Sequence, residues 1–96
     1  MSMIDLLNIK TPAETCLDVA HRAKERRRTL GLTQPQLAAK SGVSLGSLRR
    51  FEQTGEISFH SLARIAAALE CQDDFDALFG AKAFKTIQEV IDAQRK

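Results

Sequence analysis

The sequence contains only two cysteines and two histidines, too few and too far apart for a disulfide or metal framework. Cys16 and Cys71 form no CxxC motif, and neither His21 nor His60 has a ligand-type neighbour at metal-binding spacing. We therefore expect no metal site and no structural disulfide. Free cysteine is among the most buried residue types, so both cysteines are predicted to lie in the core. His60 is predicted to be exposed.

Long hydrophobic runs are also missing. No stretch approaches the ~18 consecutive apolar residues that a membrane-spanning helix needs. The apolar patch of Ile4, Leu6, Leu7 and Ile9 lacks the basic start and the small-residue cleavage site of a signal peptide. These absences predict a cytoplasmic protein that makes no contact with a membrane.

The residue patterns of common catalytic sites are absent as well. The sequence has no paired carboxylates in a polar setting, no His, Cys or Ser relay and no glycine-rich loop for a phosphate. With 96 residues, the chain has room for one domain but little room for a substrate cleft. We therefore expect a protein that is not an enzyme and that needs no cofactor.

What the sequence does contain is an ordinary globular composition with an uneven charge. Apolar residues make up 44% and charged residues 27%, which favours a compact fold over disorder. Residues 1–55 carry nine Lys or Arg against five Asp or Glu, whereas residues 56–96 carry five against seven. The densest positive run spans residues 21–28. The amino-terminal half is therefore predicted to bind a polyanion.

Hydroxyl side chains mark the starts of four predicted helices. Thr11 precedes Pro and has Glu three residues on, and Thr33 has a Gln at the same position, which can close a capping box. Ser44 and Ser58 each follow an apolar residue and precede another, which is the pattern of a hydrophobic staple. Apolar residues recur at intervals of three and four in the segments between these caps. Together these signals predict helices at about 12–30, 34–40, 45–53, 59–70 and 73–79.

The predicted helices have inward faces that form one core. The inward face of the first helix contains Val19, Ala20, Ala23, Arg27 and Leu30. The later helices contribute Leu37, Leu48, Phe51, Leu62, Ile65, Ala66, Leu69, Phe75, Leu78 and Phe79. Arg27 is the charged member of the first set, so it needs an internal partner.

Only Ser41, Gly42 and Val43 separate the second and third predicted helices. Glycine adopts the positive φ that such a tight connection requires, so the two helices form a helix-turn-helix. The outward surface of the third helix then carries Leu45, Gly46, Arg49, Arg50 and Gln53.

The chain as a whole is predicted to be an all-α protein with one domain at residues 12–80. Residues 1–11 form an amino-terminal arm, and residues 81–96 form an amphipathic helix or a tail. The carboxyl-terminal end has more apolar surface than a small core can cover, and such surface usually marks an interface. The predicted interface residues, for self-association or a partner, are Phe75, Leu78, Phe79, Phe84, Ile87 and Val90.

Several motifs occur in an order that resembles the phage-repressor and Cro-type (XRE) helix-turn-helix family. They are GLTQ at 31–34, SGVS at 41–44 and L-x-x-I-A-x-x-L at 62–69, and the resemblance covers roughly residues 16–79. It implies a compact five-helix, lambda-repressor-like domain that binds double-stranded DNA, as a dimeric repressor on an inverted repeat. The tract at 44–58 also resembles small antitoxins encoded beside kinase-type toxins. That second resemblance implies a toxin partner and autoregulation.

The family inserts the amino-terminal part of its recognition helix into the major groove. By this resemblance Arg50 is the main base reader and Arg49 the second, because arginine can donate two hydrogen bonds to guanine O6 and N7. Ser47 discriminates weakly, Leu45 can touch only a thymine methyl, and Gly46 can only permit close approach. These poor readers leave a larger share of recognition to DNA shape and phosphate contacts.

Phosphate contacts are expected first from Gln34, at the positive end of the second helix. Further candidates for phosphate contact or long-range attraction are Ser44, Gln53, Lys40, Arg22 and Arg26. Family members commonly pair an arginine late in the first helix with a glutamate in the recognition helix, which corresponds here to Arg27 and Glu52. This structural ion pair would explain the charged residue in the inward face.

Simpler interpretations stay open beside these. Residues 24–28 also fit a solvated helix face, Gln34 fits a plain helix start, and Arg49 fits an exposed residue that points away from the groove. The whole domain also fits a protein-interaction module that neutralises a toxin or enzyme and has little affinity for DNA. Leu45 and Gly46 favour that alternative, whereas Gln34 and the basic half favour DNA binding.

Overall fold

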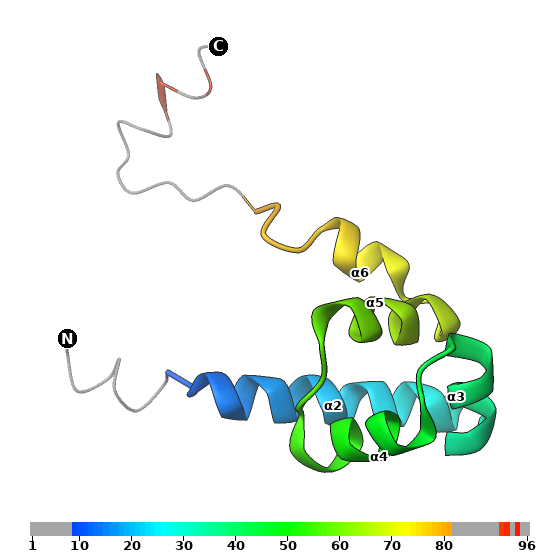
Figure 1. Cartoon of the computed structure of the whole chain (residues 1–96). Coiled ribbons are helices and arrows are strands. Elements are labelled where there is room, and N and C mark those ends of the chain that lie inside the picture. The colour runs from blue at the N-terminus through cyan, green and yellow to red at the C-terminus, as the bar shows by residue number, and fades with distance from the viewer. Residues whose placement is uncertain (1–8, 82–90, 93, 95–96) are drawn as a thin grey trace.

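The computed structural model describes residues 9–81, 91, 92 and 94 of the chain (Figure 1). Between residues 9 and 81 it contains five helices and no strand, which confirms the predicted all-α class. The helices are α2 (Pro12–Thr29), α3 (Gln34–Ser41), α4 (Leu45–Thr54), α5 (Phe59–Ala68) and α6 (Gln72–Asp76). Residues 1–8 of the predicted arm and the predicted interface residues Phe84, Ile87 and Val90 lie outside the described residues.

All four predicted hydroxyl caps are present. Thr11, Thr33, Ser44 and Ser58 each accept a hydrogen bond from the backbone N–H three residues on, at 3.1–3.2 Å. At Thr33 the capping box closes, because the side chain of Gln36 accepts the Thr33 N–H at 2.9 Å. Each cap satisfies an amide that has no partner within the helix, and replacing such a residue by Ala costs about 1 kcal/mol.

Two glycines determine how α4 connects to its neighbours. Gly42 has φ 75° and makes the turn between α3 and α4. Ser41 belongs to α3, so the connection consists of Gly42, Val43 and Ser44. Gly55 has φ 79°, and a Cβ there would lie 2.8 Å from the carbonyl carbon of Cys16. The loop after α4 therefore rests directly on the backbone of α2, where only glycine fits.

The helices pack around one apolar core. In Figure 1, α4 lies on one side of α2, α5 and α6 lie on the other, and α3 closes one end. The predicted core residues Leu37, Leu48, Phe51 and Ile65 are each only 1% exposed, so they are confirmed. The remaining buried members of this cluster are Ala20, Val43, Ala68 and Leu69.

Some predictions of burial are wrong. Cys16 is exposed, although the loop after α4 rests on its backbone, so its side chain does not enter the core. Leu78 and Phe79 are 46% and 96% exposed, because α6 ends at Asp76 rather than near residue 79. Phe79 also adopts a left-handed φ of 59°, so the chain does not continue as a helix along the core. Cys71, by contrast, is partly buried against the core.

Candidate nucleic-acid interface

The predicted recognition helix, α4, has one buried face and one open face. Leu48, Phe51 and Glu52 are buried, whereas Gly46, Ser47, Arg49, Arg50 and Gln53 are exposed and Leu45 is partly exposed. A Cβ added to Gly46 would meet no described atom within 4 Å. The structure therefore brings the predicted base-reading residues together on one accessible surface.

The opposite edge of α4 is held by a buried polar network. Glu52 Oε2 accepts from Arg27 Nε at 2.8 Å, and Glu52 Oε1 accepts from Arg27 Nη2 at 3.0 Å. Arg27 Nη1 donates to the carbonyl oxygen of Leu32 at 2.8 Å, just before α3 begins. The side chains of Arg27 and Glu52 are 9% and 3% exposed. The ion pair expected from the resemblance is thus present, and it joins α2, α4 and the loop that leads to α3.

Gln34 is part of the same network. Its Nε2 donates to Glu52 Oε1 at 3.0 Å, which places the first residue of α3 against α4. Sequence reasoning assigned Gln34 to phosphate and missed this contact. Among the described residues, no buried side-chain nitrogen or oxygen lacks a hydrogen-bond partner. A fully satisfied network of this kind favours a single arrangement of the three helices.

Glu52 is held in its ionised form. Burial by itself raises the pKa of Glu52, but hydrogen bonds from Arg27 and Gln34 and the positive charges of Arg27 and Lys24 act against it. The net result is a pKa below the usual value of a glutamate. The negative charge of Glu52 is therefore retained inside the protein, where it can keep both donors in place.

A family model described as helix-turn-helix matches residues 24–75, which is more than half of the chain. The chain belongs to this helix-turn-helix family. The match covers the last third of α2, all of α3, α4 and α5, and most of α6. The family and the predicted kind of function, a DNA-binding transcriptional regulator, are therefore confirmed. No curated protein and no solved structure matches the chain.

In this helix-turn-helix protein, the predicted recognition helix α4 is followed by an acidic residue that forms an ion pair with Arg50, which sequence reasoning missed. Arg50 Nε donates to Glu56 Oε2 at 2.9 Å, and Arg50 Nη2 donates to the same oxygen. Gly55, with its left-handed φ, turns the chain back so that Glu56 lies beside the last turn of α4. The sequence signal that could have predicted this ion pair is an acidic residue directly after a glycine that ends a helix. Arg49 makes no hydrogen bond or ion pair with another described residue.

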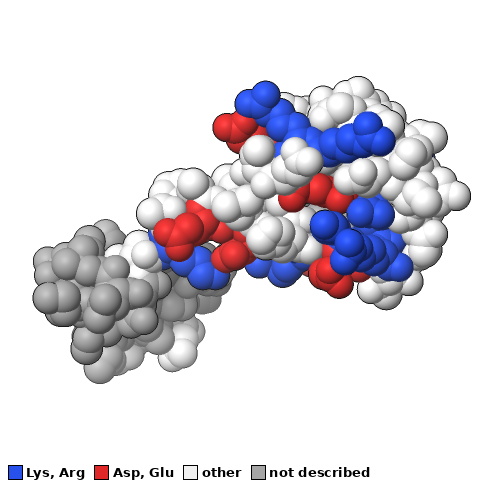
Figure 2. Space-filling model, turned by 90° about the horizontal axis from the view of Figure 1, so that it is seen from below, with Lys and Arg blue, Asp and Glu red and all other residues white. Residues whose placement is uncertain are grey.

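The other predicted phosphate residues lie in different places. Lys40, Ser44 and Gln53 are exposed along the helix-turn-helix unit. The Ser44 hydroxyl is engaged at the start of α4, where it accepts the Ser47 N–H at 3.1 Å and donates to Ser47 Oγ at 2.9 Å. Figure 2 shows the side of the molecule on which α4 lies, where basic groups alternate with acidic and uncharged ones.

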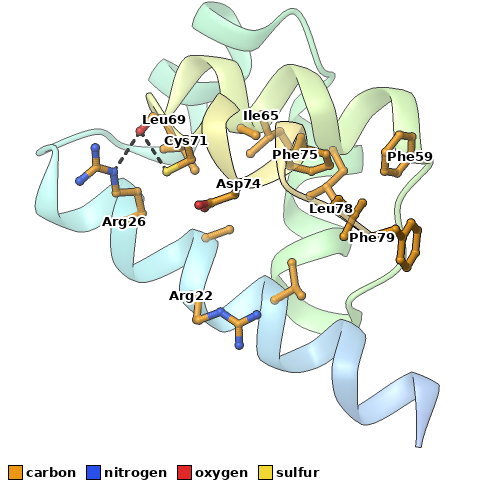
Figure 3. Close-up of a pocket in the computed structure, with 14 residues that line it drawn as sticks. Arg22, Arg26, Phe59, Ile65, Leu69, Cys71, Asp74, Phe75, Leu78 and Phe79 are labelled. Carbon is orange, nitrogen blue, oxygen red and sulfur yellow. Dashed lines mark hydrogen bonds between the residues drawn. The ribbon is translucent and has the colours of Figure 1, made fainter. Parts of the chain in front are cut away.

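Arg22 and Arg26 face away from this surface. Arg26 Nε donates to the carbonyl oxygen of Leu69 at 3.0 Å (Figure 3). Arg26 Nη2 is also 3.9 Å from Glu70 Oε2. Arg26 thus caps the carboxyl-terminal end of α5 rather than extending into solvent. Sequence reasoning missed this role, because the two partners are 43 residues apart.

An apolar groove of about 480 Å³ lies between α2, α5 and α6, and Arg22 and Arg26 line it on the side of α2 (Figure 3). Its walls include Phe59 and Phe75, whose ring centroids are 5.5 Å apart. Phe79 stands at its edge and is 96% exposed. The groove is therefore an open apolar surface outside the helix-turn-helix unit.

In the described part of the chain, no three or more His, Cys, Asp or Glu side chains are grouped so that they could hold a metal ion. The helices that the structure describes include none with the length and apolarity needed to cross a membrane.

Proposed function

We propose that the protein is a dimeric repressor that binds an inverted repeat in double-stranded DNA and reads the bases with α4. The main observation behind this proposal is that Glu52 accepts hydrogen bonds from both Arg27 and Gln34. These bonds keep α4 and the start of α3 in one arrangement, and a binding site needs its reading groups held in advance. One short helix reads too few bases for useful specificity, so two copies are required.

Base reading is assigned to the open face of α4. Arg50 is the main reader and Arg49 the second, because a guanidinium can donate two hydrogen bonds to guanine O6 and N7. Leu45 contacts a thymine methyl, Ser47 adds weak discrimination, and Gly46 allows the helix backbone to come close to the bases. The open space around Gly46 supports its assignment.

Phosphate contacts are assigned to the start of α3 and its surroundings. A helix start presents unpaired amides and the positive end of the helix dipole, which attract an anion. Gln34 lies there, and one hydrogen of its side-chain amide is directed to Glu52, which leaves the second for a phosphate. Ser44, Gln53 and Lys40 are further contacts. Arg22 and Arg26 contribute only long-range attraction, because they face the groove.

The proposal is tested with a DNA site selected by the protein itself from a random-sequence pool. Arg50→Ala should weaken binding to that site by about 1–3 kcal/mol and relax the preference at one base position. Gln34→Ala should weaken binding to selected and random DNA alike, as expected for a phosphate contact. Equal losses on both DNAs for Arg50→Ala would contradict its role as a base reader.

A salt titration tests the DNA-binding mode itself. Affinity for the selected site should fall with salt, with a log–log slope of about −0.9 for each phosphate that the protein neutralises. A dimer that uses Gln34 and Lys40 in both copies should show a slope that corresponds to several contacts. A slope near zero would contradict the assigned DNA interface.

A second candidate function is favoured by the apolar groove. We infer that the groove, with Phe75, Leu78 and Phe79, binds a protein surface, either a second copy or a toxin whose neutralisation is coupled to repression. The resemblance of residues 44–58 to small antitoxins supports the toxin alternative. Co-purification with the product of the adjacent gene, with and without operator DNA, tests it. A partner that binds only to copies with an intact groove supports it, and an unchanged complex after Phe79→Ser contradicts it.

A further inference from the structure

Glu56 makes direct contact with the residue assigned to base reading. Both side chains are exposed, at 69% for Arg50 and 62% for Glu56, so burial does not force the pair together. Glu56 Oε2 accepts from Nε and Nη2, which form one edge of the guanidinium. Nη1 makes no hydrogen bond with any described residue. The outer edge of the guanidinium, formed by Nη1 and the second hydrogen of Nη2, therefore remains available.

The position of Glu56 is fixed from two directions. Its backbone N–H donates to Thr54 Oγ1 at 3.1 Å, and the same hydroxyl donates to the carbonyl oxygen of Arg50 at 2.8 Å. On the other side, Gly55 rests on the backbone of α2, where even a Cβ would not fit. The carboxylate thus projects from an anchored loop and not from a loose one.

We propose that Glu56 is a positioning residue that makes Arg50 selective for guanine over phosphate. Holding one edge of the guanidinium reduces the side-chain entropy that Arg50 loses on binding, and the free outer edge matches the paired acceptors O6 and N7 of guanine. The negative charge of Glu56 also reduces the attraction between Arg50 and the DNA backbone, which carries no sequence information. This proposal rests on the assignment of Arg50 as a base reader.

The ratio of affinities for selected and random DNA is the quantity to measure. Glu56→Gln should strengthen binding to random DNA and lower this ratio by about three- to tenfold, because one negative charge and one ion pair are lost. Glu25→Gln is the matched control. Glu25 is an exposed carboxylate on α2 that lies 3.5 Å from Arg28, and its loss should leave the ratio unchanged.

A double-mutant cycle tests whether Glu56 acts through Arg50. In an Arg50→Ala background, Glu56→Gln should not change the ratio further. An equal fall in both backgrounds would show that Glu56 affects the ratio without Arg50 and would overturn the proposal. An unchanged ratio in the single variant, as expected for general repulsion between Glu56 and DNA, would overturn it as well. If Arg50→Ala itself leaves the ratio unchanged, the base-reading role of Arg50 fails first, which distinguishes the two failures.

Thr54→Val provides an independent variant that keeps both charges. It removes the hydroxyl that links the Glu56 N–H to the Arg50 carbonyl oxygen, so the ratio should fall by less than in Glu56→Gln while random-DNA affinity stays constant. Thermal unfolding of every variant checks that the domain is intact. A Thr54→Val protein that is folded and has the parent ratio would show that the anchor does not matter, and the positioning role would be wrong.

Discussion

The two sides of α2 differ in how their side chains are satisfied. On the side of α4, Arg27 and Glu52 are buried, and each guanidinium nitrogen and each carboxylate oxygen of this pair has a hydrogen-bond partner within the protein. On the side of α5 and α6, apolar side chains around Phe59 and Phe79 remain open to solvent. The buried polar groups of the first region therefore need no partner outside the protein. The second region exposes apolar surface to water, and such surface is stabilised only when another surface covers it.

The largest effect on stability should come from removing the buried ion pair between Arg27 and Glu52. Glu52→Ala leaves the buried guanidinium of Arg27 without its carboxylate, which should lower the free energy of unfolding by about 3–5 kcal/mol. DNA binding should fall as well, because Gln34 loses its acceptor. Chemical denaturation measures the first effect, and anisotropy with operator DNA measures the second.

A matched double variant sharpens this test. Replacing both members, as in Arg27→Met with Glu52→Leu, should restore much of the stability, because no unpaired buried charge remains. It should not restore DNA affinity if the network is needed to place Gln34. An unchanged melting temperature in Glu52→Ala would contradict the role of the ion pair.

Lowering the pH should destabilise the folded protein through the protonation of Glu52. The pKa of Glu52 is lowered in the folded protein, so the unfolded chain binds a proton there at a higher pH than the folded chain does. The stabilisation by ionised Glu52 is therefore complete above the unfolded pKa of about 4.3 and is lost as the pH falls through the lower folded value. Denaturation midpoints of the parent protein and Glu52→Gln, measured from pH 7 to pH 3, should converge at the acidic end.

The exposed Asp18 provides the control for this pH series. Its pKa is also lowered, chiefly by the hydrogen bond from Lys10, but the pair lies in solvent. An Asp18→Asn variant should therefore follow the parent curve closely, since exposed ion pairs contribute little. A parent curve that stays parallel to that of Glu52→Gln over the whole range would contradict the lowered pKa of Glu52.

A substitution of Gly46 should have opposite effects on the stability of the protein and on its binding to DNA. Gly46→Ala should raise the free energy of unfolding by up to about 1 kcal/mol, because alanine is the better helix former and its Cβ meets no described atom within 4 Å. If the backbone of α4 approaches the bases at this point, the same variant should bind its selected site more weakly. A variant that is stabilised and binds DNA normally would show that Gly46 lies outside the contact surface.

The smallest effect on stability should come from replacing an exposed apolar residue beside the groove. Phe79→Ser removes a side chain that is 96% exposed, so the free energy of unfolding should change by no more than about 0.5 kcal/mol. Self-association or partner binding should nevertheless weaken, as measured by sedimentation and pull-down. A marked loss of stability in the isolated protein would instead place Phe79 in the core.

Local signals in the sequence predict most of the fold. The hydroxyl caps at Thr11, Thr33, Ser44 and Ser58 act within one turn, so they can be read from short motifs. The bonds that depend on the path of the chain could not be read this way. Arg26 meets the carbonyl of Leu69 across 43 residues, and Arg50 meets Glu56 only because Gly55 reverses the chain.

The errors share a physical cause. Cys16 and Phe79 were predicted to be buried from residue type and periodicity. Their burial depends instead on which elements pack against them in the folded chain. The end of α6 at Asp76 and the exposure of Cys16 depend on tertiary packing and have no local pattern. The ion pair between Arg27 and Glu52 was expected only through a family resemblance, since neither residue reveals its partner alone.

The open space around Gly46 has a consequence for how this protein can change over generations. A Cβ introduced there meets no described atom within 4 Å, whereas the residues that hold α4 in place lie on its buried face. Under the proposed role of α4 in base reading, other side chains can therefore be introduced at this position without changing the buried contacts that hold the helix. The same separation makes residue 46 a natural site at which to diversify a library and redirect the protein to a different operator.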